Sequence, residues 1–337
     1  MSELPELVQA LLDPKAYPDP PQRVELAQTQ MSYVFLVDDY VYKIKKPVNF
    51  GYLDYTTLEN RRFYCQKEVE LNRRLCPDAY LGVVPVTDDN RRICISGKGK
   101  VEEYAVKMRR LPHGAMMDVL LAANRVTPAM IAEVAATLAA FHKKAATSAA
   151  ISVFGGVDAV TQNTVENFTQ TEKYIGITIP RDAYQRIKAY TEGFIDKNTT
   201  LFHKRVTEGR IRDCHGDLHA AHICFFNGIC IYDCIEFNDR FRYCDVVSEI
   251  AFLAMDMDHY GHTDLSHDFV AAYVEKSRDE ELRQLLNFYK CYRAYVRGKV
   301  GSFQYDDPYI SAGEKKKILA TARSYFELAE SYIEKAF

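Results

Sequence analysis

Residues 212–238, RDCHGDLHAAHICFFNGICIYDCIEFN, form the stretch that decides the fold expected for this chain. A loop rich in His and Asp opens it. Two apolar runs follow, residues 223–226 and 229–232, with Asn227-Gly228 between them. An Asn-Gly pair between two β-prone runs predicts a β-hairpin with a two-residue turn, because both turn residues tolerate positive φ. The turn length then fixes which residues face each other across the strands.

That register places Phe226 opposite Ile229 and, at the open end of the hairpin, His222 opposite Asp233. Directly opposed residues have Cβ atoms about 4.5–5.5 Å apart. Asp217 lies a few residues before His222 and can fold back over the same point. Two carboxylates and an imidazole around one point suit a divalent cation or a proton transfer, although each residue alone also fits an ordinary surface turn.

The segment His215-Gly216-Asp217-Leu218-His219, followed by a polar residue at 222, a hairpin and Asp233, resembles the Brenner-type catalytic core of aminoglycoside and choline phosphotransferases, relatives of the protein kinases. The family pattern is HGDxHxxN, a hairpin and then Asp. In such kinases the loop Asp accepts the substrate hydroxyl proton, while the Asn and the later Asp hold Mg²⁺ on the nucleotide phosphates. The resemblance therefore implies that Asp217 is the base and Asp233 the main metal ligand.

Position 222 departs from the family pattern, because it is His instead of Asn. A neutral imidazole can ligate a metal, but Mg²⁺ prefers oxygen ligands. We therefore expect His222 and Asp233 as the metal ligands, with Mg²⁺ as the metal and Mn²⁺ as the alternative.

The resemblance also locates the nucleotide-binding elements. Residues 24–37 and 40–46 predict a hairpin that would hold the phosphate loop, where Ser32 is the nearest hydroxyl, and the strand lysine. Lys43 is the preferred lysine; Lys45 shares its face of the strand and stays an alternative. The expected lysine partner is Glu68 in a helix at 58–75, with Glu70 as the fallback. The adenine would bond to backbone groups from Met108 to Leu111.

After Pro112 the pattern changes from strands to helices. Together with the resemblance, this predicts an α+β, bilobal protein-kinase-like fold. The antiparallel-sheet N-lobe, residues 1–108, would bind nucleotide; the mainly helical C-lobe, residues 109–337, would hold the catalytic loop, metal site and substrate groove. The expected helices are 117–123, 128–144, 163–176, 181–208, 245–257, 265–299 and 315–336, with a loop at 145–160. The chain contains no GxxxxGK[ST] motif, and over residues 25–300 it resembles the kinase-like half of bacterial two-part phosphotransferase/P-loop ATPase proteins.

Several other polar residues have expected places. Asp245 is a good helix N-cap and, with Glu249, resembles the family's Asp-x-x-x-Asp-Ile/Leu-Ala helix start. His142 is expected to be a core histidine packed under the catalytic loop. The candidates for the substrate groove or metal are acidic: Glu236, Glu249, Asp256 and Asp258.

Composition excludes some classes of protein. The net charge of −3 argues against non-specific nucleic-acid binding, and no stretch approaches the ~20 apolar residues of a membrane helix. Residues 211–280 hold 14 acidic against 5 basic side chains, which fits cation binding or a cationic substrate. Nine cysteines without a CxxC pair favour reduced thiols in a cytoplasmic protein without a signal peptide. The sequence does not indicate an oligomeric state.

The preferred interpretation is a small-molecule kinase that moves the γ-phosphoryl group of ATP to a hydroxyl of a small acceptor, with a cationic acceptor as one option. One alternative, favoured by His222, is a weakly catalytic nucleotide-binding pseudokinase that acts through a partner. Another is a metal hydrolase built on converging side chains: His215, Asp217, His219, His222 and Asp233.

Overall fold

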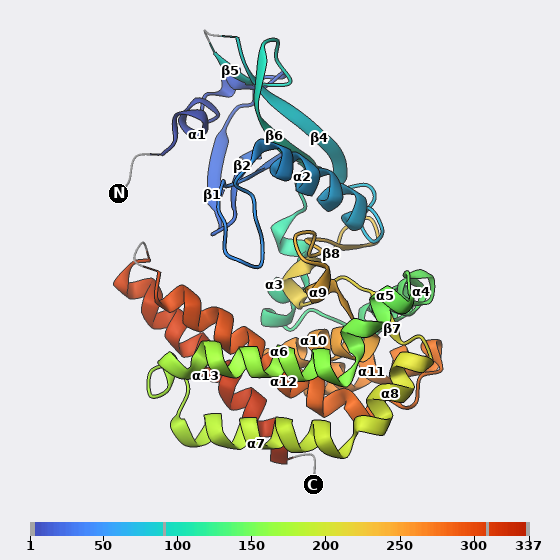
Figure 1. Ribbon diagram of the computed structural model, residues 1–337. Helices are drawn as coiled ribbons and strands as arrows, with labels where there is room; N and C mark the ends of the chain where they lie inside the picture. Colours follow the sequence, from blue (N-terminus) through green and yellow to red (C-terminus); the bar gives the residue numbers. More distant parts are fainter. Residues whose placement is uncertain (1–3, 90–91, 308–309, 335–337) are drawn as a thin grey trace. The chain divides into compact units, whose positions relative to one another are not determined.

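The computed structural model describes residues 4–89, 92–307 and 310–334. The chain divides into two compact units, both drawn in Figure 1. The first is made of Met1–Met116 and His222–Asp239, and the second of Met117–Ala221 and Arg240–Phe337. The hairpin that carries Asp233 thus groups with the N-terminal unit, whereas the division expected at residue 108 assigned it to the C-lobe. As a statement about functional lobes, that expected division stays a prediction.

The first unit contains a six-stranded sheet in the order β1-β2-β3-β6-β4-β5, and every neighbouring pair is antiparallel. This confirms the sheet predicted for the N-terminal part. The strands are β1 (Val24–Gln28), β2 (Ser32–Val37), β3 (Tyr40–Lys45), β4 (Tyr80–Asp88), β5 (Ile93–Ile95) and β6 (Lys100–Arg109).

Side-chain alternation gives the sheet two different faces. Tyr42 and Ile44 of β3 are buried in an apolar cluster that includes residues of α1 (Glu6–Ala10) and of the 3₁₀ turn Pro14–Ala16. Lys43 and Lys45 alternate with them and so face the opposite side. There α2 (Leu58–Asn72) packs on β6 and β4 (Figure 1).

Helix α2 begins where the sequence predicts and ends slightly earlier. The side chain of Thr57 caps it by accepting a hydrogen bond from the Asn60 N–H at 3.1 Å. Glu68 and Val69 lie on its buried side, whereas Phe63 is 56% exposed. The buried side of the helix therefore includes a carboxylate, that of Glu68.

The hairpin after the loop that carries Asp217 forms, but its predicted register is wrong by one residue. In β8 (Ile223–Phe225) and β9 (Ile229–Ile231) the pairs are Ile223 with Ile231 and Phe225 with Ile229. The connection is a three-residue loop, in which Asn227 (φ 54°) and Gly228 (φ 109°) both adopt positive φ. Asn-Gly therefore makes the turn as expected, but Phe226 joins the loop instead of the ladder.

The second unit is mainly helical, as predicted, and Figure 1 shows α6 and α7 lying side by side. The two helices of this unit that pack most extensively against each other are α12 and α13. No helix of the described residues is long and apolar enough to cross a membrane. The helices are α3 (Met117–Ala122), α4 (Pro128–Lys144), α5 (Ala149–Ser152), α6 (Val157–Thr171), α7 (Arg181–Lys197), α8 (Thr199–Thr207), α9 (Asp239–Arg242), α10 (Val246–His259), α11 (Thr263–Ser277), α12 (Leu282–Tyr305) and α13 (Ala312–Glu334).

Three expectations about these helices are wrong in detail. The helix predicted at 181–208 breaks at Asn198 into α7 and α8, because Asn198 leaves helical geometry with φ −111°. The helix predicted at 265–299 breaks at Arg278, which adopts a left-handed φ of 58° at the end of α11. The loop predicted at 145–160 contains α5 and the start of α6. The last residues of the helix predicted at 315–336 lie outside the described residues.

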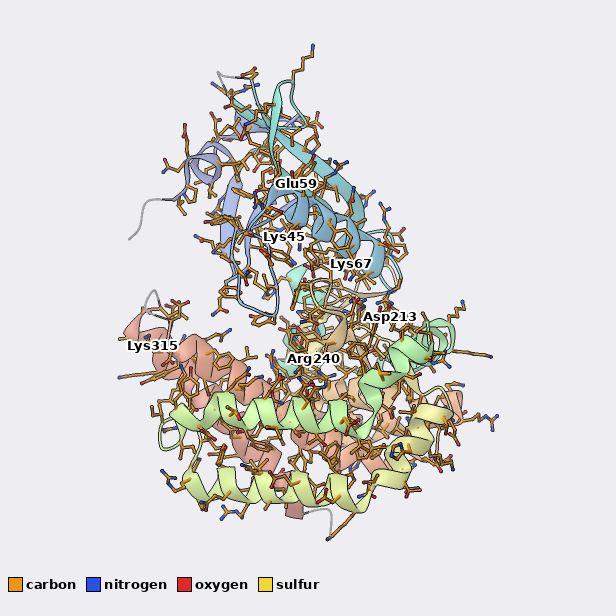
Figure 2. All side chains as sticks on the ribbon, viewed as in Figure 1. Lys45, Glu59, Lys67, Asp213, Arg240 and Lys315 are labelled. Atoms are coloured by element: carbon orange, nitrogen blue, oxygen red, sulfur yellow. A yellow bond between two sulfur atoms is a disulfide. The ribbon has the colours of Figure 1, made fainter. Side chains whose placement is uncertain are left out.

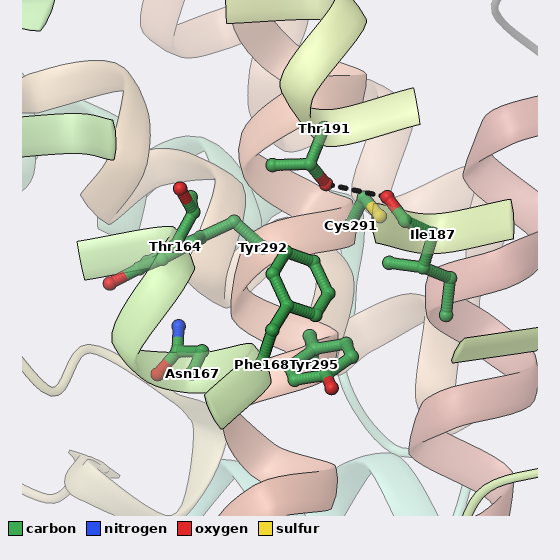
Figure 3. A pocket seen from close by; sticks show the side chains of 8 residues that line it. All are labelled: Thr164, Asn167, Phe168, Ile187, Thr191, Cys291, Tyr292 and Tyr295. Carbon is green, nitrogen blue, oxygen red and sulfur yellow. Dashed lines mark hydrogen bonds between the residues drawn. The ribbon is translucent and has the colours of Figure 1, made fainter. Parts of the chain in front are cut away.

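Figure 3 shows a small cavity inside the second unit, lined by residues of α6, α7 and α12. Its volume is about 10 Å³, room for about one water molecule. Phe168, Ile187 and Tyr295 supply much of its wall, and the Thr191 hydroxyl donates to the Ile187 carbonyl at 2.8 Å within α7. A space of this size is a packing void in the helical core and does not hold a substrate.

The expectation of reduced thiols is wrong for two of the nine cysteines. Cys76, just after α2, and Cys230, in β9, form a disulfide with Cα atoms 4.6 Å apart. They lie 154 residues apart in the sequence, so no local motif predicts that they pair. Folding of the hairpin onto the end of α2 brings them together, and the bond links two elements of the first unit.

Candidate active site

Two lysines of β3 converge on one carboxylate in the first unit. Lys43 Nζ lies 3.0 Å from Glu68 Oε1, and Lys45 Nζ, labelled in Figure 2, lies 2.7 Å from Glu68 Oε2. Residues two apart on a strand share a face, and Glu68 projects from α2 toward that face. The predicted Lys43–Glu68 contact is therefore present. Glu70, the fallback, is exposed.

The two lysines differ in their remaining partners. Lys43 donates to Asp233 Oδ1 at 2.8 Å, and its side chain is 16% exposed. Lys45 is 1% exposed and bonds to Glu236, which also accepts from the Tyr55 hydroxyl at 2.5 Å. Lys43 therefore reaches the predicted metal ligand, while Lys45 holds the interior of the unit together.

Charge explains how these buried groups stay ionised. Burial lowers the pKa of Lys43, but Asp233 and then Glu68 raise it well above its ordinary value. Burial likewise lowers the pKa of Lys45, and Glu236 and Glu68 more than reverse this. Burial raises the pKa of Glu68, yet Lys43 and Lys45 bring it below its ordinary value. Near neutral pH the cluster is therefore a set of ion pairs.

Asp233 occupies an unusual backbone position directly after β9. Its φ is 63°, in the left-handed region that Asp tolerates better than most residues. Its N–H donates to the Tyr80 hydroxyl oxygen at 3.2 Å, and the next N–H, of Cys234, donates to Asn72 Oδ1 at 2.9 Å. This turn brings Asp233 Oδ2 to 3.5 Å from His222 Nε2, although the observed register no longer pairs the two residues directly.

The other predicted nucleotide contacts lie in the sheet of the first unit. Ser32 is 2% exposed, and its N–H donates to the Thr29 hydroxyl at 3.0 Å. Met108 is paired on both sides, with Val41 and Tyr80. Leu111 lies half-buried just beyond β6. A hydroxyl as buried as that of Ser32 is less suited to phosphate than the sequence suggested.

In the second unit, a buried carboxylate holds the loop that precedes Asp217. Glu249 Oε1 accepts the N–H groups of His215 at 2.7 Å and Gly216 at 2.8 Å. Its Oε2 lies 2.7 Å from His142 Nε2, and Arg293 donates to the Gly216 carbonyl at 3.2 Å. Glu249 is thus committed to the loop and does not face a groove, and His142 packs in the core as predicted.

Asp217 itself is less enclosed than the loop before it. Its side chain is 35% exposed, and Oδ2 lies 3.6 Å from His219 Nε2. The His219 ring packs against Phe252 with centroids 5.7 Å apart. Anchored backbone on one side and a packed imidazole on the other fix the direction of the carboxylate, which can accept a proton from a neighbouring hydroxyl.

Sequence reasoning missed two residues of these networks. Tyr55 lies in the connection between β3 and α2, and Arg293 lies in the middle of α12. Neither belongs to a motif, since each acts through a contact with a residue far away in the chain. For Arg293 the sequence offered no distinguishing signal, because Lys290 and Arg297 are further cations on the same side of the helix.

The different surroundings of the two lysines generate a stability prediction. Lys45→Met should lower the free energy of unfolding by about 3–5 kcal/mol, because it leaves buried carboxylates short of a counter-ion. Lys43→Met should cost clearly less, since Asp233 is 42% exposed and Glu68 keeps Lys45. Denaturant unfolding of both variants gives the comparison. Equal losses would show that the two lysines are equivalent structurally.

A second prediction concerns pH. Burial raises the pKa of Glu249, but the hydrogen bond and charge of His142, the charge of His215 and the Gly216 N–H lower it to about 2. Stability from this carboxylate is present above its unfolded pKa of 4.5 and is lost as pH falls toward 2, on the order of 3 kcal/mol in all. Glu249→Gln should be destabilised by that order at pH 7.

The difference in unfolding free energy between wild type and Glu249→Gln should narrow as pH falls below 4.5. The matched control is Glu192→Gln, on the exposed side of α7, which should unfold like wild type at every pH. A gap that stays constant between pH 7 and pH 3 would contradict the assignment of the ionised carboxylate as the stabilising form.

The chain is similar to known proteins in sequence and in structure. No family model matches the sequence. Uncharacterized proteins of Mycobacterium tuberculosis and Mycobacterium bovis are each 34% identical to the chain over 278 residues. The matches cover 82% of this chain and 54% of each relative, so the chain spans about half the length of the curated relatives it matches.

Two solved structures resemble the chain along most of its length. A choline/ethanolamine kinase family protein from Mesorhizobium loti has a TM-score of 0.50 and 12% identity, covering 93% of this chain and 92% of its own. An aminoglycoside phosphotransferase from Alicyclobacillus acidocaldarius has a TM-score of 0.50 and 12% identity, covering 99% and 96%. The chain therefore has the α+β, bilobal protein-kinase-like fold of the aminoglycoside and choline phosphotransferases, as its sequence predicted.

Proposed function

We propose that the protein is an ATP-dependent phosphotransferase that moves the γ-phosphoryl group to a hydroxyl of a small molecule. The observation that carries the proposal is the contact of Lys43 with both Glu68 and Asp233, at 3.0 and 2.8 Å. A strand lysine, a helix glutamate and the Asp after a hairpin are the parts that kinases use to hold nucleotide phosphates and their metal. Here all three belong to one compact unit.

Lys43 would place its ammonium on the phosphates, and Glu68 would hold that ammonium in position. The three-way contact suits this role, because Lys43 can exchange its bond to Asp233 for a phosphate oxygen while Glu68 keeps it oriented. Lys45 is too enclosed for the same task. The adenine would bond to the backbone from Met108 to Leu111, and Ser32 would contact a phosphate.

His222 and Asp233 form a donor set that fits a divalent metal. Their nearest nitrogen and oxygen atoms are 3.5 Å apart. Two ligands that are each ~2.1 Å from one ion lie roughly 3.0–3.5 Å apart. A bound Mg²⁺ or Mn²⁺ would neutralise charge on the phosphates. The carboxylate supplies the oxygen that Mg²⁺ prefers, and the imidazole favours Mn²⁺.

Asp217 would orient the acceptor hydroxyl and take its proton. The acceptor oxygen forms a bond to the γ-phosphorus, the bond from that phosphorus to the bridging oxygen breaks, and ADP leaves. Little covalent chemistry falls to the protein, so position and charge dominate the rate. The support for this role is the fixed backbone before Asp217, which Glu249 and Arg293 hold from two sides.

A specific observation also favours the pseudokinase alternative. His222 stands where the resembled family has an Asn whose amide oxygen holds the metal. The His222 and Tyr232 rings pack together with centroids 5.7 Å apart. A nucleotide-binding protein with slow turnover would have such a site. The metal hydrolase has less support, because His215 and His219 are 1% and 6% exposed.

The phosphotransferase proposal is tested with Asp217→Asn. Its acceptor-dependent ATP turnover should fall by about 10²–10⁴-fold, the usual contribution of a general base, while nucleotide affinity stays within about twofold of wild type. Turnover is measured with a panel of hydroxylated metabolites and aminoglycosides, with Mg²⁺ and with Mn²⁺. The control is Asp196→Asn, exposed on α7. A wild type that binds ATP but phosphorylates no acceptor would support the pseudokinase alternative.

The role of His222 is tested by restoring the family residue. If the imidazole is a ligand, His222→Asn should raise Mg²⁺-dependent turnover and reduce the preference for Mn²⁺, because an amide oxygen replaces a nitrogen. Metal titrations followed by turnover at fixed pH give both quantities. An unchanged rate and an unchanged metal preference would place His222 outside the metal shell.

A further inference from the structure

One face of α12 borders the loop that carries Asp217. Arg293 bonds to the Gly216 carbonyl at 3.2 Å and to the Ser248 hydroxyl at 3.1 Å, so its turn of the helix lies against the start of that loop. Arg297 follows one turn later, and residues four apart lie on the same helix face. Arg297 therefore lies on the same side of α12 as Arg293, the side that borders the loop with Asp217.

Contacts around Arg297 connect it to the end of the same loop. The guanidinium lies 5.4 Å from the ring of Tyr325 in α13. The Tyr325 hydroxyl donates to Asp256 Oδ1 at 3.0 Å, and Asp256 Oδ2 accepts the Ala220 N–H at 2.8 Å. Burial lowers the pKa of Arg297, but Tyr325, Asp256 and Asp217 raise it above its ordinary value. Arg297 is thus a permanent cation close to the candidate base.

Arg297 differs from Arg205 and Arg242, two other arginines of this unit, in its bonding. Arg205 is held by Asp245 at 2.6 Å and by Asp279 at 2.6 Å, and Arg242 by Asp213 at 2.6 Å. Arg297 is half-buried, and its buried Nε has no hydrogen-bond partner among the described residues. Both carboxylate oxygens of its neighbour Asp256 accept hydrogen bonds, one from Tyr325 and one from Ala220. Because the Nε is enclosed, an incoming anion would meet the Nη groups, and among the described residues no carboxylate hydrogen-bonds to this guanidinium.

The acidic excess of residues 211–280 does not contradict an anionic ligand, because much of it is bound internally. Asp245 pairs with Arg205, and Glu249 with His142 and the loop backbone. Asp258 Oδ2 accepts from Lys290 at 2.8 Å and from the Tyr332 hydroxyl at 2.6 Å. The net charge of the segment therefore overstates the negative charge that a substrate would meet.

We propose that Arg297 binds an anionic oxygen group of the acceptor, a carboxylate or a phosphate, so that the substrate is a hydroxylated anion such as a hydroxy acid or a sugar phosphate. This rests on the proposed function, since it names the substrate class of the same site. The planar guanidinium matches two oxygens of such a group at once, with the Tyr325 ring fixing its plane. The acceptor hydroxyl then faces Asp217.

The test uses sets of ligands that share a hydroxylated carbon skeleton and differ in one neutral, anionic or cationic group, titrated into the full chain by calorimetry. One set is glycerol, glycerate, glycerol phosphate and 2-amino-1,3-propanediol; the other is glucose, glucuronate, glucose 6-phosphate and glucosamine. In at least one set the carboxylate or the phosphate should bind about tenfold or more tightly than the neutral compound. Which of the two binds tells a hydroxy acid from a phosphorylated acceptor. Wild type that prefers no anionic member overturns the proposal, and this arm needs no variant to fold.

Two variants and a control locate the effect. Arg297→Gln should abolish the anionic preference, and Arg297→Lys should keep part of it for phosphate but less for carboxylate, because lysine lacks the planar fork. Lys299→Gln removes a cation from the same helix that instead bonds Asn167 and Gln170, and should keep the preference. A preference that survives Arg297→Gln in protein that melts like wild type rejects the assignment.

Phosphoryl transfer, measured in the same samples with ATP and Mg²⁺, separates this proposal from the proposed function. Selective anion binding without any phosphorylated product would keep Arg297 as an anion site and reject the kinase. Product from neutral or cationic acceptors at equal or higher kcat/KM would keep the kinase and reject the anionic acceptor. An equal fall of kcat for every acceptor in Arg297→Gln, with KM unchanged, would make Arg297 a positioning residue for Asp217 and also reject the proposal.

Discussion

The first unit depends on one buried carboxylate, Glu68, which two lysines of the same strand approach together. Burying an unpaired charge costs folding free energy, so the ammonium groups and carboxylates are buried as ion pairs. Lys43 also forms an ion pair with Asp233, and Lys45 forms one with Glu236. The network thereby ties a distant hairpin to the sheet and to α2. Two positive and three negative groups leave a net charge of −1, which is compatible with a further cation.

The second unit solves a similar problem with one carboxylate and backbone donors. Glu249 takes the N–H groups of His215 and Gly216, so a polar loop can begin inside a buried region without unpaired donors. His142 and Arg293 hold the same place from α4 and α12. Asp217 is left at the edge of this rigid arrangement. Fixed backbone next to an accessible carboxylate is the arrangement that positional catalysis requires.

Local patterns predicted the elements well but their ends less well. Alternation in β3 identified Lys43 and Lys45 as one face, and the family resemblance gave Glu68 as the partner of Lys43. Asn227-Gly228 predicted the hairpin, yet the loop took in Phe226, because three-residue loops with positive φ compete closely with two-residue turns. Helix periodicity does not show a single residue leaving helical geometry, so the break at Arg278 was missed.

The sequence by itself determined the fold class and most of the elements, and it marked Asp217 and Asp233 as motif residues, because periodicity, turn chemistry and motif spacing are local properties of a chain. Only the tertiary structure decided which distant groups meet. The φ of 63° at Asp233 brings its carboxylate to His222 despite the shifted register. The Cys76–Cys230 bond and the placing of Arg297 beside Tyr325 likewise arise from packing between elements far apart in sequence. Such contacts depend on where whole elements are packed, which no local pattern encodes.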